Sequence, residues 1–129
     1  MADPIIQFKN DYHFLSNFHR CDIVYQGDVY PSSEHLYQAM KTTIPKEREW
    51  VRQSETPGQA KKRGKLVPKR PDWNQVKVDY MRSALLLKFS QNPELADRLI
   101  DTGKALLVEG NYWGDTYWGV SLKTREGKN

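Results

Sequence analysis

The longest stretch of regular apolar spacing in this chain begins immediately after Asp72. Its apolar side chains recur at intervals of three and four residues: Trp73, Val76, Tyr80, Met81, Ala84 and Leu85. That spacing places them in one stripe and predicts a helix with one buried face. A chain of 129 residues can bury the core of one domain but is short for two, so we expect a single domain.

A β-hairpin is predicted to lead directly into a helix. Residues Cys21–Tyr25 and Val29–Pro31 are typical of short strands, and Gln26–Asp28 supplies a turn containing glycine. The hydroxyl of Ser32 or Ser33 can cap the helix that follows. The apolar stripe of that helix consists of Leu36, Ala39 and Met40.

Two more helices have start and stop signals. Thr56 can cap one, with Gln59 placed nearly as in a capping box, and Gly64 is its predicted end. Pro93 begins the other and Gly103 ends it. Its predicted inward residues are Leu95, Leu99 and Ile100. The segment ALLVEG that follows, residues 105–110, is predicted to be a buried strand.

Cysteine content and the amino terminus exclude several classes of protein. Cys21 is the only cysteine, so an intrachain disulfide and a thiolate metal cluster are both excluded. The start MADPIIQFKN does not resemble a secretory signal, and the apolar runs 84–87 and 105–108 are too short to cross a bilayer. We therefore expect a cytoplasmic protein with no membrane contact.

The net charge of +4 is concentrated in one segment, the basic run 61–70, which contains no acidic residue. Its basic members are Lys61, Lys62, Arg63, Lys65, Lys69 and Arg70. Such a run can neutralise the phosphates of a nucleotide or a nucleic acid. It is equally typical of a solvated helix face and loop.

A polar line is predicted on the helix that follows the hairpin. Glu34, Gln38 and Lys41 stand four and three residues apart, so they share one face. An exposed face with ordinary ion pairing is one interpretation. A functional interpretation gives Glu34 the role of a base, or of an anion that stabilises developing positive charge, because a helix start favours an ionised carboxylate.

The histidines do not have metal-ligand spacing. His35 lies about 100° around the helix from Glu34, which favours a hydrogen-bonded core histidine or an exposed one over a catalytic partner. His13 and His19 fall in predicted loop. We therefore predict no metal site.

Two further segments combine aromatic and polar residues. FLSNF, residues 14–18, suits a turn at the core edge, or Asn17 can hold sugar hydroxyls. GNYWGDTYWG, residues 110–119, contains two Tyr-Trp-Gly copies separated by Asp115. Its glycines disfavour a packed strand and suit close approach to a ligand, and its rings can stack on a base. We expect that these four rings are not all buried.

Several separated motifs, in order, resemble the YbiA-like, or NADAR, family. They are FLSNF at 14–18, GDVYPSSEHLYQAMK at 27–41, the Lys88-Phe89 pair, NPEL at 92–95 and YWGD at 112–115. The resemblance covers the chain from about Phe8 to Asn129. Members of the family usually continue beyond a segment like 127–129 into a closing amphipathic helix, so we expect residues 1–129 to form a single domain without it.

The resemblance implies a compact α+β domain, mostly helical, with short strands and a hairpin. It also implies an N-glycosidase that needs no metal and no cofactor. Members of the family cut the bond between ribose C1 and a nitrogen. One class hydrolyses phosphorylated ribosylaminopyrimidines of the riboflavin pathway and releases ribose 5-phosphate, and another removes ADP-ribose from guanine in nucleic acid.

Site roles are carried over to the matching positions. Glu34 would stabilise positive charge at C1, and Asp115 would be the second carboxylate. Lys41 would meet the phosphate or, in a rival route, attack C1 as a Schiff-base nucleophile, which requires a lowered pKa. The predicted substrate-binding residues are Asn17, Phe18, Ser33, Gln38, Tyr112, Trp113 and Gly114.

A hypothesis of a different class is a non-catalytic nucleotide or nucleic-acid binding module. It would use the basic run and the aromatic segment, and its binding would depend strongly on salt. The sequence leaves the oligomeric state open. The predicted partners are a small phosphorylated ribosyl substrate or ADP-ribosylated nucleic acid.

Overall fold

The computed structural model describes residues 2–129, which divide into two units along the chain. One unit is the continuous segment 17–96, and the other combines residues 2–16 with 97–129. Helices form most of the regular structure and the strands are two or three residues long, which confirms the predicted α+β class. None of the helices in this described part has the length and apolar character needed to cross a membrane.

The hairpin of unit 17–96 is present as predicted. Strands β1 (Ile23–Tyr25) and β2 (Asp28–Tyr30) are antiparallel, and Ile23 pairs with Tyr30. The turn residues Gln26 and Gly27 both have positive φ, 51° and 86°, as the tight turn of a two-residue hairpin requires. A short loop then brings the chain to the helix that holds most of the predicted site.

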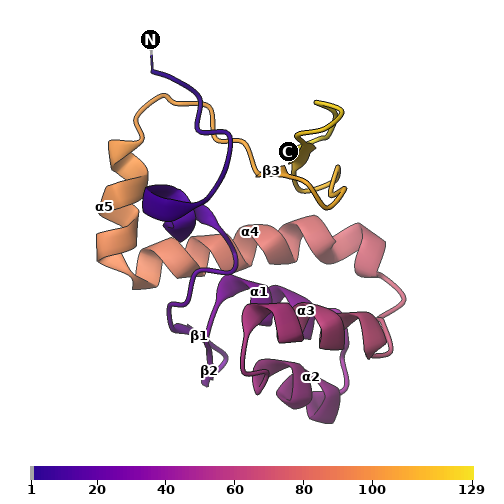
Figure 1. Ribbon diagram of the computed structural model, residues 1–129. Coiled ribbons are helices and arrows are strands. Elements are labelled where there is room, and N and C mark those ends of the chain that lie inside the picture. Colours follow the sequence, from indigo (N-terminus) through magenta and orange to yellow (C-terminus); the bar gives the residue numbers. More distant parts are fainter. Residues whose placement is uncertain (1) are drawn as a thin grey trace. The chain divides into compact units, whose positions relative to one another are not determined.

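Four helices lie wholly within this unit: α1 (Ser33–Ala39), α2 (Pro45–Arg52), α3 (Pro57–Leu66) and α4 (Trp73–Gln91). Helix α1 contacts the other three, and Figure 1 shows it between α4 and the pair formed by α2 and α3. Ser32 caps α1 as predicted, because its Oγ accepts a hydrogen bond from the backbone N–H of His35. Every residue of α1 is buried, so its polar side chains lie in the interior.

Helix α3 begins as predicted but does not end at Gly64. Thr56 Oγ1 accepts from the N–H of Gln59, and Gln59 Oε1 accepts from the N–H of Glu55. The helix continues through Gly64 to Leu66. The prediction of a stop was wrong because this glycine serves close packing: an added Cβ would lie 2.9 Å from Cδ of Gln38 on α1.

Helix α4 confirms the prediction of a long helix that begins after Asp72. Trp73, Met81 and Ala84 are buried, and the other predicted stripe residues are partly buried. Asp72 stands at the N-cap without a side-chain capping bond, because its carboxylate pairs with Arg70. The sequence interpretation did not identify α2, a helix of eight residues that begins at Pro45.

The other unit contains shorter elements. A 3₁₀ helix, η1, spans Asn10–Leu15, and strands β3 (Gly110–Asn111) and β4 (Val120–Ser121) are parallel. The predicted buried strand at 105–110 was wrong. A single bridge joins Leu107 to Ile5, and Leu106 is exposed. A β-strand needs several paired residues in a row, and in the apolar run 105–108 only Leu107 is paired.

Helix α5 (Pro93–Asp101) begins in one unit and ends in the other. Leu95 is buried and Leu99 is partly buried, as predicted, but Ile100 is exposed. The error is one of helical phase, since a residue five positions after Leu95 lies about 140° away from it around the axis. Gly103 follows with φ of 58°, the left-handed conformation expected where a helix ends.

Candidate active site

The polar line predicted on α1 is buried. Glu34 has 7% of its surface exposed and Gln38 has 4%. The Nε2 of Gln38 donates to Oε2 of Glu34 over 3.3 Å, and its Oε1 is buried without a hydrogen-bond partner in residues 2–129. An exposed face with ordinary ion pairing is therefore excluded, because a carboxylate in such a place needs specific partners.

Asn17 and Ser33 join Glu34 at the start of α1. Ser33 Oγ donates to Oδ1 of Asn17 over 2.8 Å, and the backbone N–H of Glu34 donates to the carbonyl of Asn17 over 3.2 Å. The amide of Asn17 also donates to the sulfur of Met81 on α4. Phe18 is exposed and lies near the first turn of α3, where a Cβ on Gly58 would be 3.9 Å from its ring. These contacts bring together predicted residues from two separate motifs.

Lys41 follows α1 and is partly buried. Its Nζ lies 5.9 Å from the centre of the Tyr37 ring. The pKa of Lys41 is lowered from 10.5 to about 8, chiefly by burial and also by repulsion from Lys69, Lys65 and Lys61, while attraction from Glu34 opposes the shift. A substantial fraction of this amine is therefore neutral at pH 8.

The basic run has two structural roles. Lys61, Lys65 and Lys69 lower the pKa of Lys41 through charge repulsion. Arg63 instead stacks on the Trp50 ring at 4.9 Å and donates to the carbonyl of Trp50. Arg70 forms two bonds with the carboxylate of Asp72. The run is thus neither a uniform solvated face nor a continuous cationic stripe.

His35 is a hydrogen-bonded core histidine. Its Nε2 lies 2.9 Å from the carbonyl of Ser54, and its Nδ1 lies 2.6 Å from the hydroxyl of Ser32. A carbonyl only accepts, so Nε2 carries the proton and Nδ1 accepts from the serine. Burial lowers the pKa of His35, the Ser54 bond opposes that shift, and Arg20 adds to it. Of the two alternatives for His35, the satisfied core histidine is confirmed.

The aromatic segment is a loop with two exposed and two partly buried rings. Tyr112 and Trp113 are 59% and 64% exposed, whereas Tyr117 and Trp118 pack edge to face with centres 4.7 Å apart. The expectation that not all four rings are buried is confirmed. Gly114 lies between the two pairs with φ of 85°, so it supplies a turn that other residues would strain to make.

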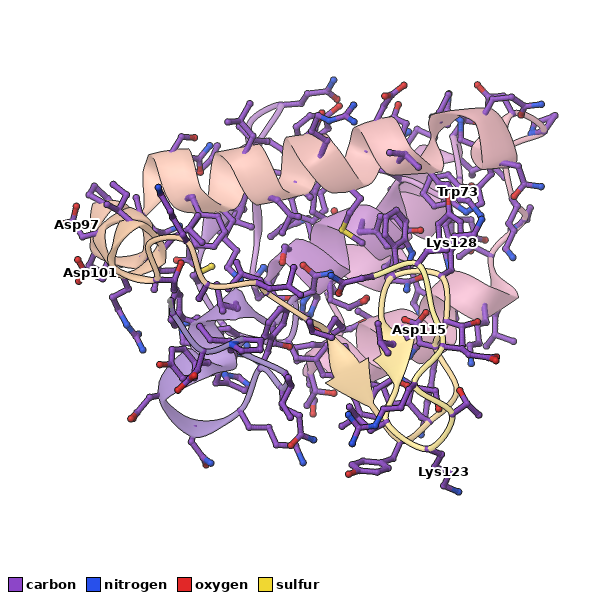
Figure 2. The ribbon with its side chains drawn as sticks, turned by 90° about the horizontal axis from the view of Figure 1, so that it is seen from above. Trp73, Asp97, Asp101, Asp115, Lys123 and Lys128 are labelled. Atoms are coloured by element: carbon purple, nitrogen blue, oxygen red, sulfur yellow. The ribbon has the colours of Figure 1, made fainter. Side chains whose placement is uncertain are left out.

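The side chain of Asp115 stabilises the loop in which it lies. Its Oδ1 accepts from the backbone N–H groups of Tyr117 and Trp118, over 3.1 and 3.0 Å. The buried side chain of Asn111 pairs with both backbone groups of Asp115. Figure 2 shows Asp115 beside the short strands, in the loops that also carry Lys123 and Lys128. Asn111 is an organising residue that the sequence interpretation missed, and its signal was the affinity of asparagine for turns.

The predicted site residues therefore fall into two groups. One group lies along and before α1: Asn17, Phe18, Ser33, Glu34, Gln38 and Lys41. The other group lies in the aromatic loop: Tyr112, Trp113, Gly114 and Asp115. A small recess lined by residues of the hairpin and α2, among them Tyr30 and Glu49, contains none of them. Within residues 2–129, no group of three or more histidine, cysteine or acidic residues could hold a metal ion.

Comparison with known proteins identifies relatives along nearly the whole chain. The NADAR domain model matches residues 6–129. The chain is 40% identical over 124 residues to N-glycosidase YbiA of Escherichia coli strain K12, covering 92% of this chain and 77% of that protein. It is 37% identical over 123 residues to the riboflavin biosynthesis protein VVA0006 of Vibrio vulnificus, covering 92% of this chain and 33% of that protein.

A solved structure agrees with this relationship. The NMR structure of the E. coli protein YbiA matches with a TM-score of 0.80 at 40% identity, over 92% of this chain and 73% of that one.

Proposed function

Because the chain belongs to the NADAR domain family and is a hydrolase of N-glycosyl bonds, we propose that its substrate is a phosphorylated ribosylaminopyrimidine. In this proposal the enzyme breaks the bond between ribose C1 and the amine nitrogen and releases ribose 5-phosphate. The names of two relatives, an N-glycosidase and a riboflavin biosynthesis protein, support this substrate class.

The observation that carries the proposal is the presence of a buried carboxylate, Glu34, and a lysine of lowered pKa, Lys41, on one short segment. Glu34 is a buried carboxylate, and its charge acts on the amine of Lys41. Cleavage of a ribosyl C–N bond builds positive charge at C1 and the ring oxygen. A fixed carboxylate in a site that excludes water stabilises such charge far more than one in bulk solvent.

Two routes can follow, and they differ in the group that attacks C1. In the first, water attacks while Glu34 stabilises the cation, and the leaving amine takes a proton. In the second, the ribosylamine opens to an imine and the neutral amine of Lys41 displaces the pyrimidine amine. Water then hydrolyses the lysine imine to give the sugar aldehyde and free lysine. Overall, each route consumes one water.

The lowered pKa of Lys41 favours the second route. A protonated amine has no electron pair for attack, whereas an amine with a pKa of about 8 is substantially neutral near that pH. Burial and neighbouring cations are the two means by which lysine nucleophiles are activated, and both act on Lys41. Glu34 retains its role in this route, since the iminium at C1 is also positively charged.

The remaining predicted residues of unit 17–96 are proposed to hold the substrate. Asn17, fixed by Ser33, would bind ribose hydroxyls, with Phe18 beside it, and Gln38 would hold Glu34 in place. In the other unit, the rings of Tyr112 and Trp113 are exposed and could stack on a planar ring, on a loop whose turn at Gly114 leaves them accessible. The role of Asp115 as a second carboxylate stays a prediction from the resemblance, and the bonds of its Oδ1 stabilise this loop.

The test is a direct comparison of substrates. The protein is incubated with a ribosylaminopyrimidine phosphate and, separately, with an oligonucleotide that carries ADP-ribose on guanine. Release of ribose 5-phosphate from the first supports the proposal. Release of ADP-ribose from the second alone would assign the alternative substrate. Salt-dependent binding to nucleic acid without any product would instead indicate a non-catalytic module.

A further inference from the structure

We infer that Lys61, Lys65 and Lys69 form, beside Lys41, a binding site for a phosphate monoester. The site would hold the substrate through a group that does not react. This inference deepens the proposed function, and it rests on that function only for the identity of the ester, ribose 5-phosphate.

Two of the lysines are placed by the packing of α3 on α1. Lys61 and Lys65 stand one helical turn apart on α3, and Gly64, the residue of α3 that packs against Gln38 of α1, lies between them in sequence. Gln38 precedes Lys41 by three residues, and the N–H of Lys41 bonds to its carbonyl over 3.2 Å. The contact between these helices therefore holds this part of α3 against the segment that ends in Lys41.

The third lysine is placed by the loop after α3. The backbone N–H of Arg70 donates to the carbonyl of Lys41 over 2.7 Å, so Lys69 is held next to the end of α1. Repulsion from all three lysines lowers the pKa of Lys41, with Lys69 contributing the most. Because charge repulsion weakens with distance, these are the lysines whose charges act most on Lys41. Glu34 is the acid whose attraction opposes them, so positive charge remains in excess.

The arrangement fits a single phosphate group better than a nucleic-acid strand. A nucleic-acid surface contacts phosphates in a row. Here the charges of three lysines act on one partly buried amine, and the arginines of the same run are engaged with Trp50 and with Asp72. A phosphate monoester brings a charge of about −1.5 to −2 and three acceptor oxygens to one point. We therefore assign the cluster to a monoester.

The experiment is calorimetric titration of the full chain, at fixed ionic strength, with ribose 5-phosphate, inorganic phosphate and ribose. We expect both phosphates to bind and ribose to bind far more weakly. Single substitutions of Lys61, Lys65 or Lys69 by alanine should weaken phosphate binding about two- to fivefold each. The triple variant should lose about 10- to 100-fold.

Lys62→Ala is the matched control, because Lys62 is an exposed lysine of the same helix that is not among the charges acting on Lys41. It should change phosphate affinity less than twofold. Equal affinity of the triple variant and the unaltered protein would overturn the inference. A second result would also overturn it: an unmodified single-stranded oligonucleotide binds more tightly than phosphate, and Lys62→Ala weakens that binding as much as the substitutions of Lys61, Lys65 or Lys69 do. That result would identify a nucleic-acid surface.

Measurements of turnover distinguish a failure of the phosphate site from a failure of the proposed function. If phosphate binds through the three lysines but no C1–N bond is cut in any substrate, the phosphate site stands and the proposed function fails. If the enzyme cuts phosphorylated and dephosphorylated substrates equally well, and the triple variant keeps that activity, the proposed function stands and the phosphate site fails.

Discussion

Gly64 on α3 packs directly against the side chain of Gln38 on α1. A Cβ on Gly64 would lie 2.9 Å from Cδ of Gln38 and closer still to its Oε1. The same Gln38 amide donates to Glu34, so the glycine on one helix determines where the amide on the other can sit. The position of the buried carboxylate therefore depends on a close approach of two helices.

Gly64→Ala should weaken both stability and turnover. The added methyl group must displace Gln38 or separate the helices, and overpacking of this kind costs about 1–3 kcal/mol. Urea denaturation measures the loss of stability, and steady-state kinetics measure the loss of turnover. Combining Gly64→Ala with Gln38→Ala removes the two closest atoms, Oε1 and Cδ, and leaves only the Cβ of residue 38 at 3.0 Å, so the double variant should be more stable than Gly64→Ala alone. Independent, additive losses would show that the two residues are not coupled.

Glu34→Gln should lower kcat by about 100- to 1,000-fold, because the amide keeps the shape of the side chain and removes the charge that stabilises C1. Circular dichroism and thermal melting should show a folded protein. Turnover close to that of the unaltered enzyme, with the fold intact, would exclude Glu34 from the chemistry.

Lys41 should form a covalent intermediate that borohydride can trap. Reduction of the imine would add the mass of the sugar phosphate to the peptide that contains Lys41, and Lys41→Arg should abolish the adduct. Because the pKa of Lys41 is lowered to about 8, kcat/KM should rise with pH up to about 8 and then level off. An active enzyme that gives no lysine adduct would establish the route in which water attacks.

Substitutions of Asp115 distinguish its two proposed roles. Asp115→Asn retains an oxygen that can accept from the N–H groups of Tyr117 and Trp118, but it removes the carboxylate. A large loss of kcat in this variant indicates a catalytic carboxylate. If Asp115→Asn is active and only Asp115→Ala is impaired, the residue shapes the loop. Tryptophan fluorescence reports whether the loop is retained.

Stability should fall as the pH is lowered below about 6.5, partly through His35. Its pKa is lowered in the native protein, so below 6.5 the unfolded chain binds more protons than the folded one. The stabilisation is fully present above 6.5 and is lost as the pH falls through the lowered value, at a slope of no more than about 1.4 kcal/mol per pH unit.

Urea denaturation at several pH values measures that slope. His35→Gln should reduce it, because glutamine does not titrate, while His13→Gln, at an exposed position, serves as the matched control. A direct NMR titration of His35 that gave a pKa above 6.5 would contradict the prediction.

Local signals in the sequence were sufficient for the elements with strong local preferences. The hairpin turn at Gln26–Gly27, the caps at Ser32 and Thr56 and the periodic helix after Asp72 all depend on residues within a few positions of one another. The error at Gly64 has a different origin. Gly64 looks like a helix end because glycine has weak helix propensity, and only its neighbour Gln38 explains why the helix continues through it.

By itself, the sequence determined which residues could carry the chemistry, since helical spacing alone places Glu34, Gln38 and Lys41 on one face of a helix. Only the tertiary structure decided that this face is buried, that Lys61, Lys65 and Lys69 act on Lys41, and that Lys41 has a lowered pKa. The physical reason is that burial and charge repulsion depend on the distances between groups, and packing sets those distances for residues far apart in the chain.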